Sequence, residues 1–207
     1  MKIKSPKILN CEDKNLFDAY VEGEYTNYKF SENVQEEILI SSSTFDGCIF
    51  QNINFNNIKL KDMDIIDSIF ENCDLSNQVF DNKYLNRVVF KNCKMLGTSF
   101  VDASLKDVCF ENCTSKYLNF SNSKINNISF LDSVLAESSF MEANIKNVGF
   151  EKVDLYRAEF VKTNLKDVDF SSSDINGAIF DMESLKGIVV DEYQCRNIVG
   201  MFGVKVK

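Results

Sequence analysis

The stretch VCFENCTSKYLNFSNSKINNISF, residues 108–130, repeats with a period of five. Its positions that are multiples of five hold Phe110, Ser115, Phe120, Ile125 and Phe130. Five residues of α-helix turn by about 500°, so these side chains would lie on different faces of a helix. In a flat strand, side chains five positions apart point to opposite faces. The pattern therefore requires a chain that turns a corner within every five residues.

The same period governs most of the chain. Between residues 45 and 180, fifteen of the 18 phenylalanines fall on multiples of five, where chance would place about a fifth of them. Two residues before each of these centres the chain places small or apolar residues, which we expect to point inward. Two residues after most centres it places Asn, Asp or Gly, which tolerate the positive φ of a tight turn. This turn column weakens at Glu137, Glu142, Lys152, Arg157 and Lys162, which predicts less regular turns there.

A second period of 20 residues lies on top of the first. Like residues recur at this spacing, for example Phe90, Phe110 and Phe130, or Leu85, Leu105 and Ile125. Four groups of five therefore make one coil, and successive coils stack at the inter-strand spacing of roughly 4.8 Å. Ladders of aromatic side chains then fill the interior.

These repeats resemble the pentapeptide-repeat family, in which A-(D/N)-L-x-x recurs in tandem. The matching segments include CDLSN (73–77), ASLKD (103–107), ANIKN (143–147) and TNLKD (163–167). The resemblance implies an all-β fold, a right-handed quadrilateral parallel β-helix. We expect an N-terminal cap with an irregular first coil over residues 1–42, the β-helix over 43–190, and a short helix and strand over 191–207. Because the spacing has no insertion from 45 to 190, we expect no projecting loops.

The C-terminal stretch LKGIVVDEYQCRNIVGMFGVKV, residues 185–206, resembles the end of the quinolone-resistance (Qnr) pentapeptide proteins. The matching residues are Leu185, Gly187, Asp191, Tyr193, Gln194, Phe202, Gly203 and Val204. In that family this tail caps the open end of the coil and forms a tail-to-tail homodimer. The resemblance implies a dimer interface that contains Tyr193, Ile198, Val199, Phe202 and Val204. It also implies that the protein binds the type II DNA topoisomerases gyrase and topoisomerase IV by imitating DNA, and protects them from quinolones.

The charge balance excludes direct nucleic-acid binding as the simplest function. The 23 basic and 31 acidic residues give a net charge of −8, whereas nucleic-acid affinity rests on Lys and Arg. Corner positions gather carboxylates into a predicted acidic partner-binding face, which comprises Asp62, Asp64, Asp67, Asp102, Asp107, Glu142, Asp167 and Asp169. A basic column runs nearby through Lys106, Lys146, Lys166 and Lys186. The face is therefore either a DNA-mimicking surface or a solvated surface of mixed charge.

The sequence favours a non-enzymatic protein without a cofactor or a small-molecule substrate. It has no histidine, no Gly-rich phosphate loop and no nucleophile motif, and a packed β-helix interior leaves no cleft of the usual ligand size. The N-terminus lacks the apolar stretch of a secretory signal, and no run approaches the roughly 18 apolar residues of a membrane span. We therefore expect a cytoplasmic protein whose seven cysteines are reduced.

Polar residues and cysteines test the predicted register. Cys113 lies two residues before a centre and is expected to face inward, stacked on Cys93 and Cys73, whereas Cys109 is expected to face outward. The two sulfurs of the C-x-x-x-C pair therefore cannot share a metal or a disulfide. Gln78, Lys83 and Ser115 also occupy inward columns, and the sequence offers no reason for them.

Two functions are compatible with the sequence. One is a DNA mimic that acts on gyrase or topoisomerase IV, and the other is a scaffold of pentapeptide repeats with an unrelated protein partner. The C-terminal motif favours the first function, and the mixed surface charge favours the second.

Overall fold

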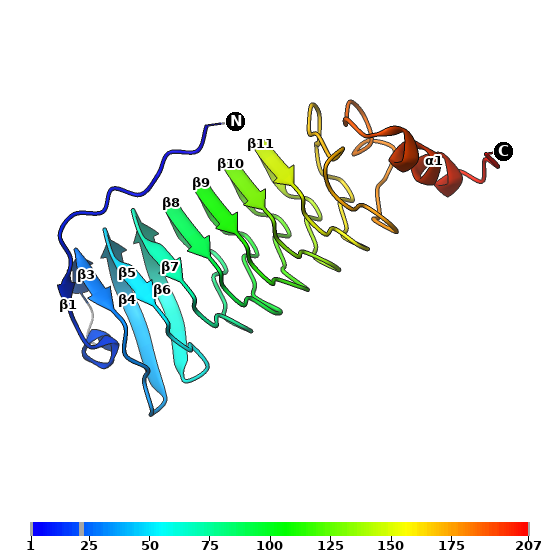
Figure 1. Ribbon diagram of the computed structural model, residues 1–207. Helices are drawn as coiled ribbons and strands as arrows, with labels where there is room; N and C mark the ends of the chain where they lie inside the picture. The colour runs from blue at the N-terminus through cyan, green and yellow to red at the C-terminus, as the bar shows by residue number, and fades with distance from the viewer. Residues whose placement is uncertain (1, 21–22, 207) are drawn as a thin grey trace.

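The structure is a computed structural model that describes residues 2–20 and 23–206. The chain winds into a stack of coils that ends in one α-helix (Figure 1). The regular elements are β1 (Glu12–Asp13), a 3-10 helix η1 (Leu16–Tyr20), β2 (Gly23–Thr26), β3 (Tyr28–Phe30), β4 (Ile38–Asp46), β5 (Ile49–Gln51), β6 (Ile58–Ile66), β7 (Ile69–Glu71), β8 (Tyr84–Lys91), β9 (Ser104–Glu111), β10 (Lys124–Leu131), β11 (Asn144–Glu151) and α1 (Glu192–Met201).

Strand pairing follows the 20-residue period. In the middle of the stack, Phe90 of β8 pairs with Phe110 of β9, which pairs with Phe130 of β10, always in parallel. Beyond the last strand, isolated parallel bridges continue the same spacing as far as Asp169 and Val189. The prediction of a parallel β-helix with a short C-terminal helix is therefore confirmed, while its right-handed sense stays a prediction.

The corners follow the period of five. Residues two positions after the centres adopt left-handed backbone angles, with φ of 52° at Asn112 and 59° at Asn122. The expectation of less regular turns in the later coils was wrong, because Lys152 and Arg157 have φ of 53° and 54°. Hydrogen bonds between coils hold these corners, as at Glu137, whose amide donates to the carbonyl of the next coil at 2.7 Å. Coil stacking therefore imposes the strained angle on residue types that do not favour it.

Two aromatic ladders fill the interior. Phe90 and Phe110 stack with ring centroids 4.9 Å apart, and so do Phe100 and Phe120. Between the ladders, Phe100 meets Phe110 edge to face at 6.0 Å and 87°. Such pairs are worth about 0.5–1.5 kcal/mol each beyond the burial of their area. The same side chain thus stabilises its own coil and fixes the register of its neighbours.

Regular pairing extends into the segment that was expected to be irregular. β2 pairs with β4 and β3 pairs with β5, so Tyr25 stacks on Phe45 and Phe30 stacks on Phe50, both at 5.1 Å. The 3-10 helix η1 buries Leu16 completely and covers this end of the core. Residues 31–37, which the sequence predicts as a turn or loop, adopt neither helix nor strand.

The inward cysteines behave as small apolar residues. Cys73, Cys93 and Cys113 are buried and free, and each sulfur lies 3.4 Å from a carbonyl oxygen of the preceding coil. Hydrogen bonding with the Cys113 thiol, together with burial, raises the pKa of Cys93 to about 12. These thiols therefore stay protonated, and they pack rather than react. Cys109 lies on the outer surface, where it lines a groove beside Ile3.

Candidate interaction surface

One corner of the stack presents regularly spaced carboxylates. Asp62, Asp102 and Glu142 are exposed, and each has a positive φ, between 46° and 56°. They lie 40 residues apart, which is two coils or roughly 10 Å along the stack. Glu142 forms an ion pair of 2.7 Å with Lys162, which reduces the charge at that end. Asp64, Asp167 and Asp169 of the predicted acidic face are also exposed.

Two members of the predicted acidic face are not on the surface. Asp67 and Asp107 are 5% and 1% exposed, because the N-terminal strap (residues 2–11) runs over them. The amide of Lys7 donates to Asp67 at 2.9 Å, and that of Lys4 donates to Asp107 at 3.3 Å. Figure 1 shows the strap following one edge of the coils from near β10 back to β1. The prediction of an exposed acidic face is therefore wrong at these two positions.

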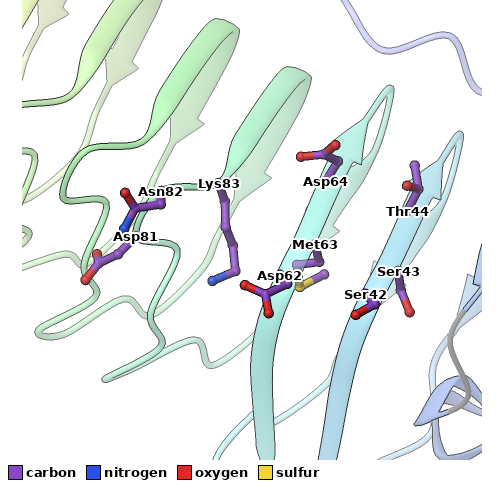
Figure 2. A pocket seen from close by; sticks show the side chains of 9 residues that line it. All are labelled: Ser42, Ser43, Thr44, Asp62, Met63, Asp64, Asp81, Asn82 and Lys83. Atoms are coloured by element: carbon purple, nitrogen blue, oxygen red, sulfur yellow. The ribbon is translucent and has the colours of Figure 1, made fainter.

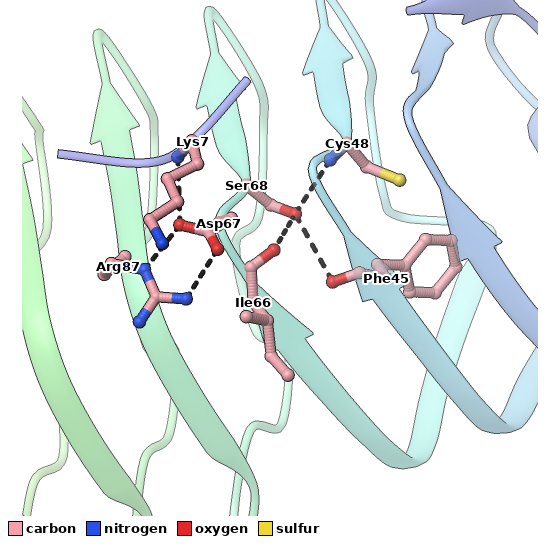
Figure 3. A network of polar contacts seen from close by, with 7 residues as sticks. All are labelled: Lys7, Phe45, Cys48, Ile66, Asp67, Ser68 and Arg87. Carbon is pink, nitrogen blue, oxygen red and sulfur yellow. Dashed lines mark hydrogen bonds and ion pairs between the residues drawn. The ribbon is translucent and has the colours of Figure 1, made fainter. Parts of the chain in front are cut away.

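Arg87 completes the burial of Asp67. The guanidinium, one coil away, donates to both carboxylate oxygens at 2.5 Å (Figure 3). Burial by itself would raise the pKa of Asp67, but the hydrogen bonds from Arg87 and from the amide of Lys7 outweigh it, so the pKa is lowered from its usual 3.8. A bidentate pair of this kind is stronger than an exposed ion pair. Asp67 therefore serves the stability of this corner.

A polar hollow lies beside the exposed carboxylates. It has a volume of about 220 Å³ and is lined by Ser42, Ser43, Thr44, Asp62, Met63, Asp64, Asp81, Asn82 and Lys83 (Figure 2). It exists because two neighbouring coils separate. β4 and β6 pair from Ile38 and Ile58 onward, whereas β6 pairs with β8 only from Asp64 to Ile66. Segment 58–63 therefore faces the hollow instead of a neighbouring coil.

Lys83 and Gln78 line or fill this separation, which explains why polar residues occupy inward columns there. Lys83 is 7% exposed, and its ammonium donates to the carbonyl of Val79 at 2.8 Å. Burial lowers its pKa, and the nearby carboxylates of Asp81 and Asp62 oppose that shift. The side-chain amide of Gln78 donates to the carbonyl of Phe55 at 3.0 Å. Each side chain thus satisfies a carbonyl near the opening.

The C-terminal motif closes the other end of the stack. Asp191 is the N-cap of α1 and forms a reciprocal capping box with Gln194. The side-chain amide of Gln194 also donates to the carbonyls of Phe170 and Ser173, at 2.8 and 2.7 Å. One buried glutamine thus starts the helix and satisfies the last coil. The role of Gln194 was not foreseen from its position alone.

The predicted dimer residues divide into two groups. Tyr193, Phe202 and Val204 are 76%, 52% and 53% exposed, which is unusual for large apolar side chains. Ile198 packs partly against the core of its own chain, and Val199 is partly buried. The first group is available to a partner, and the second mainly anchors α1.

The described residues offer neither a metal site nor a membrane-spanning helix. Over residues 2–20 and 23–206, no group of three or more His, Cys, Asp or Glu side chains could hold a metal ion. Within the same ranges, no helix is long and apolar enough to cross a membrane.

Family models agree with the geometry. A model described as "Pentapeptide repeat region" matches residues 63–140, and one described as "Pentapeptide repeats (8 copies)" matches residues 150–181. The chain belongs to the pentapeptide-repeat family. No curated protein matches the sequence of this pentapeptide-repeat protein.

Solved structures are similar at low identity. QnrB1, a plasmid-mediated fluoroquinolone resistance protein, is 21% identical, with 87% of this chain and 90% of that chain covered and a TM-score of 0.40. HetL, a pentapeptide-repeat protein involved in heterocyst differentiation regulation from the cyanobacterium Nostoc sp., is 15% identical, with coverage of 82% and 90% and a TM-score of 0.42. The pectin methylesterase of Aspergillus niger is 10% identical, with coverage of 92% and 88% and a TM-score of 0.38. We draw no functional conclusion from these likenesses.

Proposed function

We propose that this pentapeptide-repeat protein is a non-enzymatic homodimer that binds a type II DNA topoisomerase, gyrase or topoisomerase IV, as a mimic of DNA. The observation that carries the proposal is the C-terminal motif shared with the Qnr proteins. Gln194 and Asp191 of that motif cap the coil, while its apolar members Tyr193, Phe202 and Val204 remain exposed. A motif that both closes the stack and leaves an apolar end supports end-to-end pairing of two rods.

The dimensions support an imitation of DNA, with a limited charge. Roughly 7 coils span about 35 Å, so a tail-to-tail dimer is about 70 Å long. Duplex DNA of that length carries roughly 40 phosphates. The dimer carries −16, which is twice −8. The mimicry therefore depends on where the charge is concentrated, and the corner of Asp62, Asp102 and Glu142 is the best candidate.

The test is a supercoiling assay with purified gyrase, titrated with the protein in the presence and absence of a fluoroquinolone. We expect inhibition without the drug or rescue in its presence. If neither effect occurs at micromolar protein, the topoisomerase proposal is rejected. The regular register, without projecting loops, makes modulation of gyrase the stronger expectation and rescue the weaker one.

A matched pair of variants separates the acidic corner from overall charge. The first is Asp62→Asn, Asp102→Asn and Glu142→Gln, and the second is Asp132→Asn, Glu137→Gln and Glu151→Gln, whose residues are exposed at other places. Both remove three negative charges from each protomer. Only the first should weaken the effect on gyrase, and equal loss in both would assign the effect to net charge.

A scaffold with an unrelated protein partner is the second candidate. It is favoured by the ion pair of Glu142 with Lys162 and by the basic column at Lys106 and Lys146, which dilute the acidic character of the surface. An unaffected gyrase, combined with a dimer in light scattering, would support this candidate.

A further inference from the structure

The N-terminal strap lies on the solenoid as an extended peptide lies on a binding surface. It is held by few points along its length. The thiol of Cys11 lies 3.4 Å from the carbonyl oxygen of Gly47, the amide of Lys7 binds Asp67, and the amide of Lys4 binds Asp107. These three corner residues belong to one column with a spacing of 20 or 40 residues, so the strap runs along the axis of the stack.

The repeat of the solenoid matches the repeat of an extended chain. Asp67 and Asp107 are two coils apart, which is roughly 9.6 Å. Lys4 and Lys7 are three residues apart, and three extended residues span about 10 Å. An extended peptide can therefore place every third amide on the carboxylate of every second coil without strain. This match does not depend on the identity of the strap, because it uses main-chain amides.

Charge adds a preference for basic peptides. Lys2, Lys4 and Lys7 give the strap a positive charge, and the Lys7 ammonium helps to keep the pKa of Asp67 low. Asp107 retains an unused acceptor, because its second carboxylate oxygen is buried and has no hydrogen-bond partner in the described part of the chain. Its first oxygen accepts from the strap and from Asn127 at 3.1 Å. The pocket under the strap is thus built for a cationic ligand with free main-chain amides.

The surface continues beyond the point where the strap begins. A groove of about 450 Å³ starts at Lys2 and follows the same corner along Asn127, Asn147 and Asp167. The strap therefore covers only part of a longer track.

We propose that the corner column of Asp67, Arg87 and Asp107 is a binding surface for an extended, lysine-containing peptide segment of a partner protein, and that the strap occupies it as an internal ligand. A partner segment gains the surface by displacing the strap. This inference concerns a different surface from that of Asp62, Asp102 and Glu142, so it stands whether or not the partner is a topoisomerase.

The test uses the full-length chain with its strap repelled. In the variant Lys4→Glu, Lys7→Glu, like charges oppose the strap at Asp67 and Asp107, while the coils keep every residue. A fluorescently labelled peptide with the sequence of residues 2–10, KIKSPKILN, is titrated into this variant and into the unaltered protein, and binding is followed by anisotropy. Hydrogen exchange of the amides of residues 2–11 reports whether the strap has left.

We expect faster exchange in the variant, and binding of the peptide at least tenfold tighter than to the unaltered protein, where a tethered strap competes at an effective concentration on the order of millimolar. Adding Asp67→Asn and Asp107→Asn to the variant should abolish binding, and a peptide with Glu in place of its Lys residues should not bind. The proposal is overturned if the strap stays protected in the variant, if the released surface does not bind the peptide, or if binding ignores the two aspartates.

Discussion

Two interior serines make opposite predictions for the same substitution. Ser115 is completely buried between coils, and its hydroxyl has no hydrogen-bond partner within the described residues. Ser133 is 2% exposed, and its hydroxyl donates to the carbonyl of Leu131 at 2.7 Å and accepts from the amide of Cys113 at 2.9 Å. Replacing each serine by alanine removes the same atom from equally buried sites. The difference between the two results therefore isolates the value of a satisfied hydroxyl.

The magnitudes follow from the cost of an unmade hydrogen bond. A buried hydroxyl without a partner costs about 1–3 kcal/mol, so Ser115→Ala should stabilise the protein by about 1 kcal/mol after the small loss of packing. Ser133→Ala leaves the buried amide of Cys113 without its acceptor and should destabilise by about 2 kcal/mol. At roughly 2–4 °C per kcal/mol for a chain of this size, the unfolding midpoint rises by about 2–4 °C in the first variant and falls by about 4–8 °C in the second.

Thermal unfolding followed by far-ultraviolet circular dichroism measures both variants against the unaltered protein. If Ser115→Ala lowers the midpoint as Ser133→Ala does, the hydroxyl of Ser115 is satisfied in solution and the reasoning is refuted. Equal midpoints for all three proteins would show that neither hydroxyl contributes, which also contradicts it.

Three further predictions follow from the ends, the corner and the thiols. Gln194→Ala should destabilise the last coil by about 2 kcal/mol, seen as faster hydrogen exchange there, while Asn197→Ala, which removes an exposed hydrogen bond to Asn176, should cost about 0.5 kcal/mol or less; equal effects would deny Gln194 its capping role. Because the pKa of Asp67 is lowered on folding, its contribution to stability is complete above pH 4 and is lost as the pH falls through the folded value, so Asp67→Asn should flatten the acid limb of a stability profile between about pH 4 and 2. Cys195 is exposed and should react with a thiol reagent at pH 8 before unfolding, whereas Cys93, with its pKa raised to about 12, should react only after unfolding, and early labelling of Cys93 would contradict the packed interior.

The repeat could be predicted from the sequence because its signal is local and recurs. Each centre such as Phe110 meets its copies 20 residues away, so a mistake at one position is corrected by the others. The inward burial of Cys113 followed from the register in the same way. The turn column illustrates the limit, because Lys152 and Arg157 have the same positive φ as asparagine under the constraint of the stacked coils.

The surface could not be predicted as completely, because one repeat position does not reveal what covers it. Asp67 and Asp107 have the same pattern as the exposed Asp62 and Asp102, and only the strap separates the two pairs. A signal was present in Arg87, which follows Asp67 by one coil and offers a buried partner for its charge.

The sequence by itself determined the period, the inward columns and the capped C-terminus, because these depend on residues that repeat or on short local motifs. Only the tertiary structure decided which carboxylates reach the solvent and where the coils separate. The strap meets Asp107 across 103 residues of sequence, and β6 leaves the neighbouring coil beside Lys83. Contacts of that separation depend on the whole packed stack, since a long-range partner is chosen by geometry and charge rather than by its neighbours in the chain.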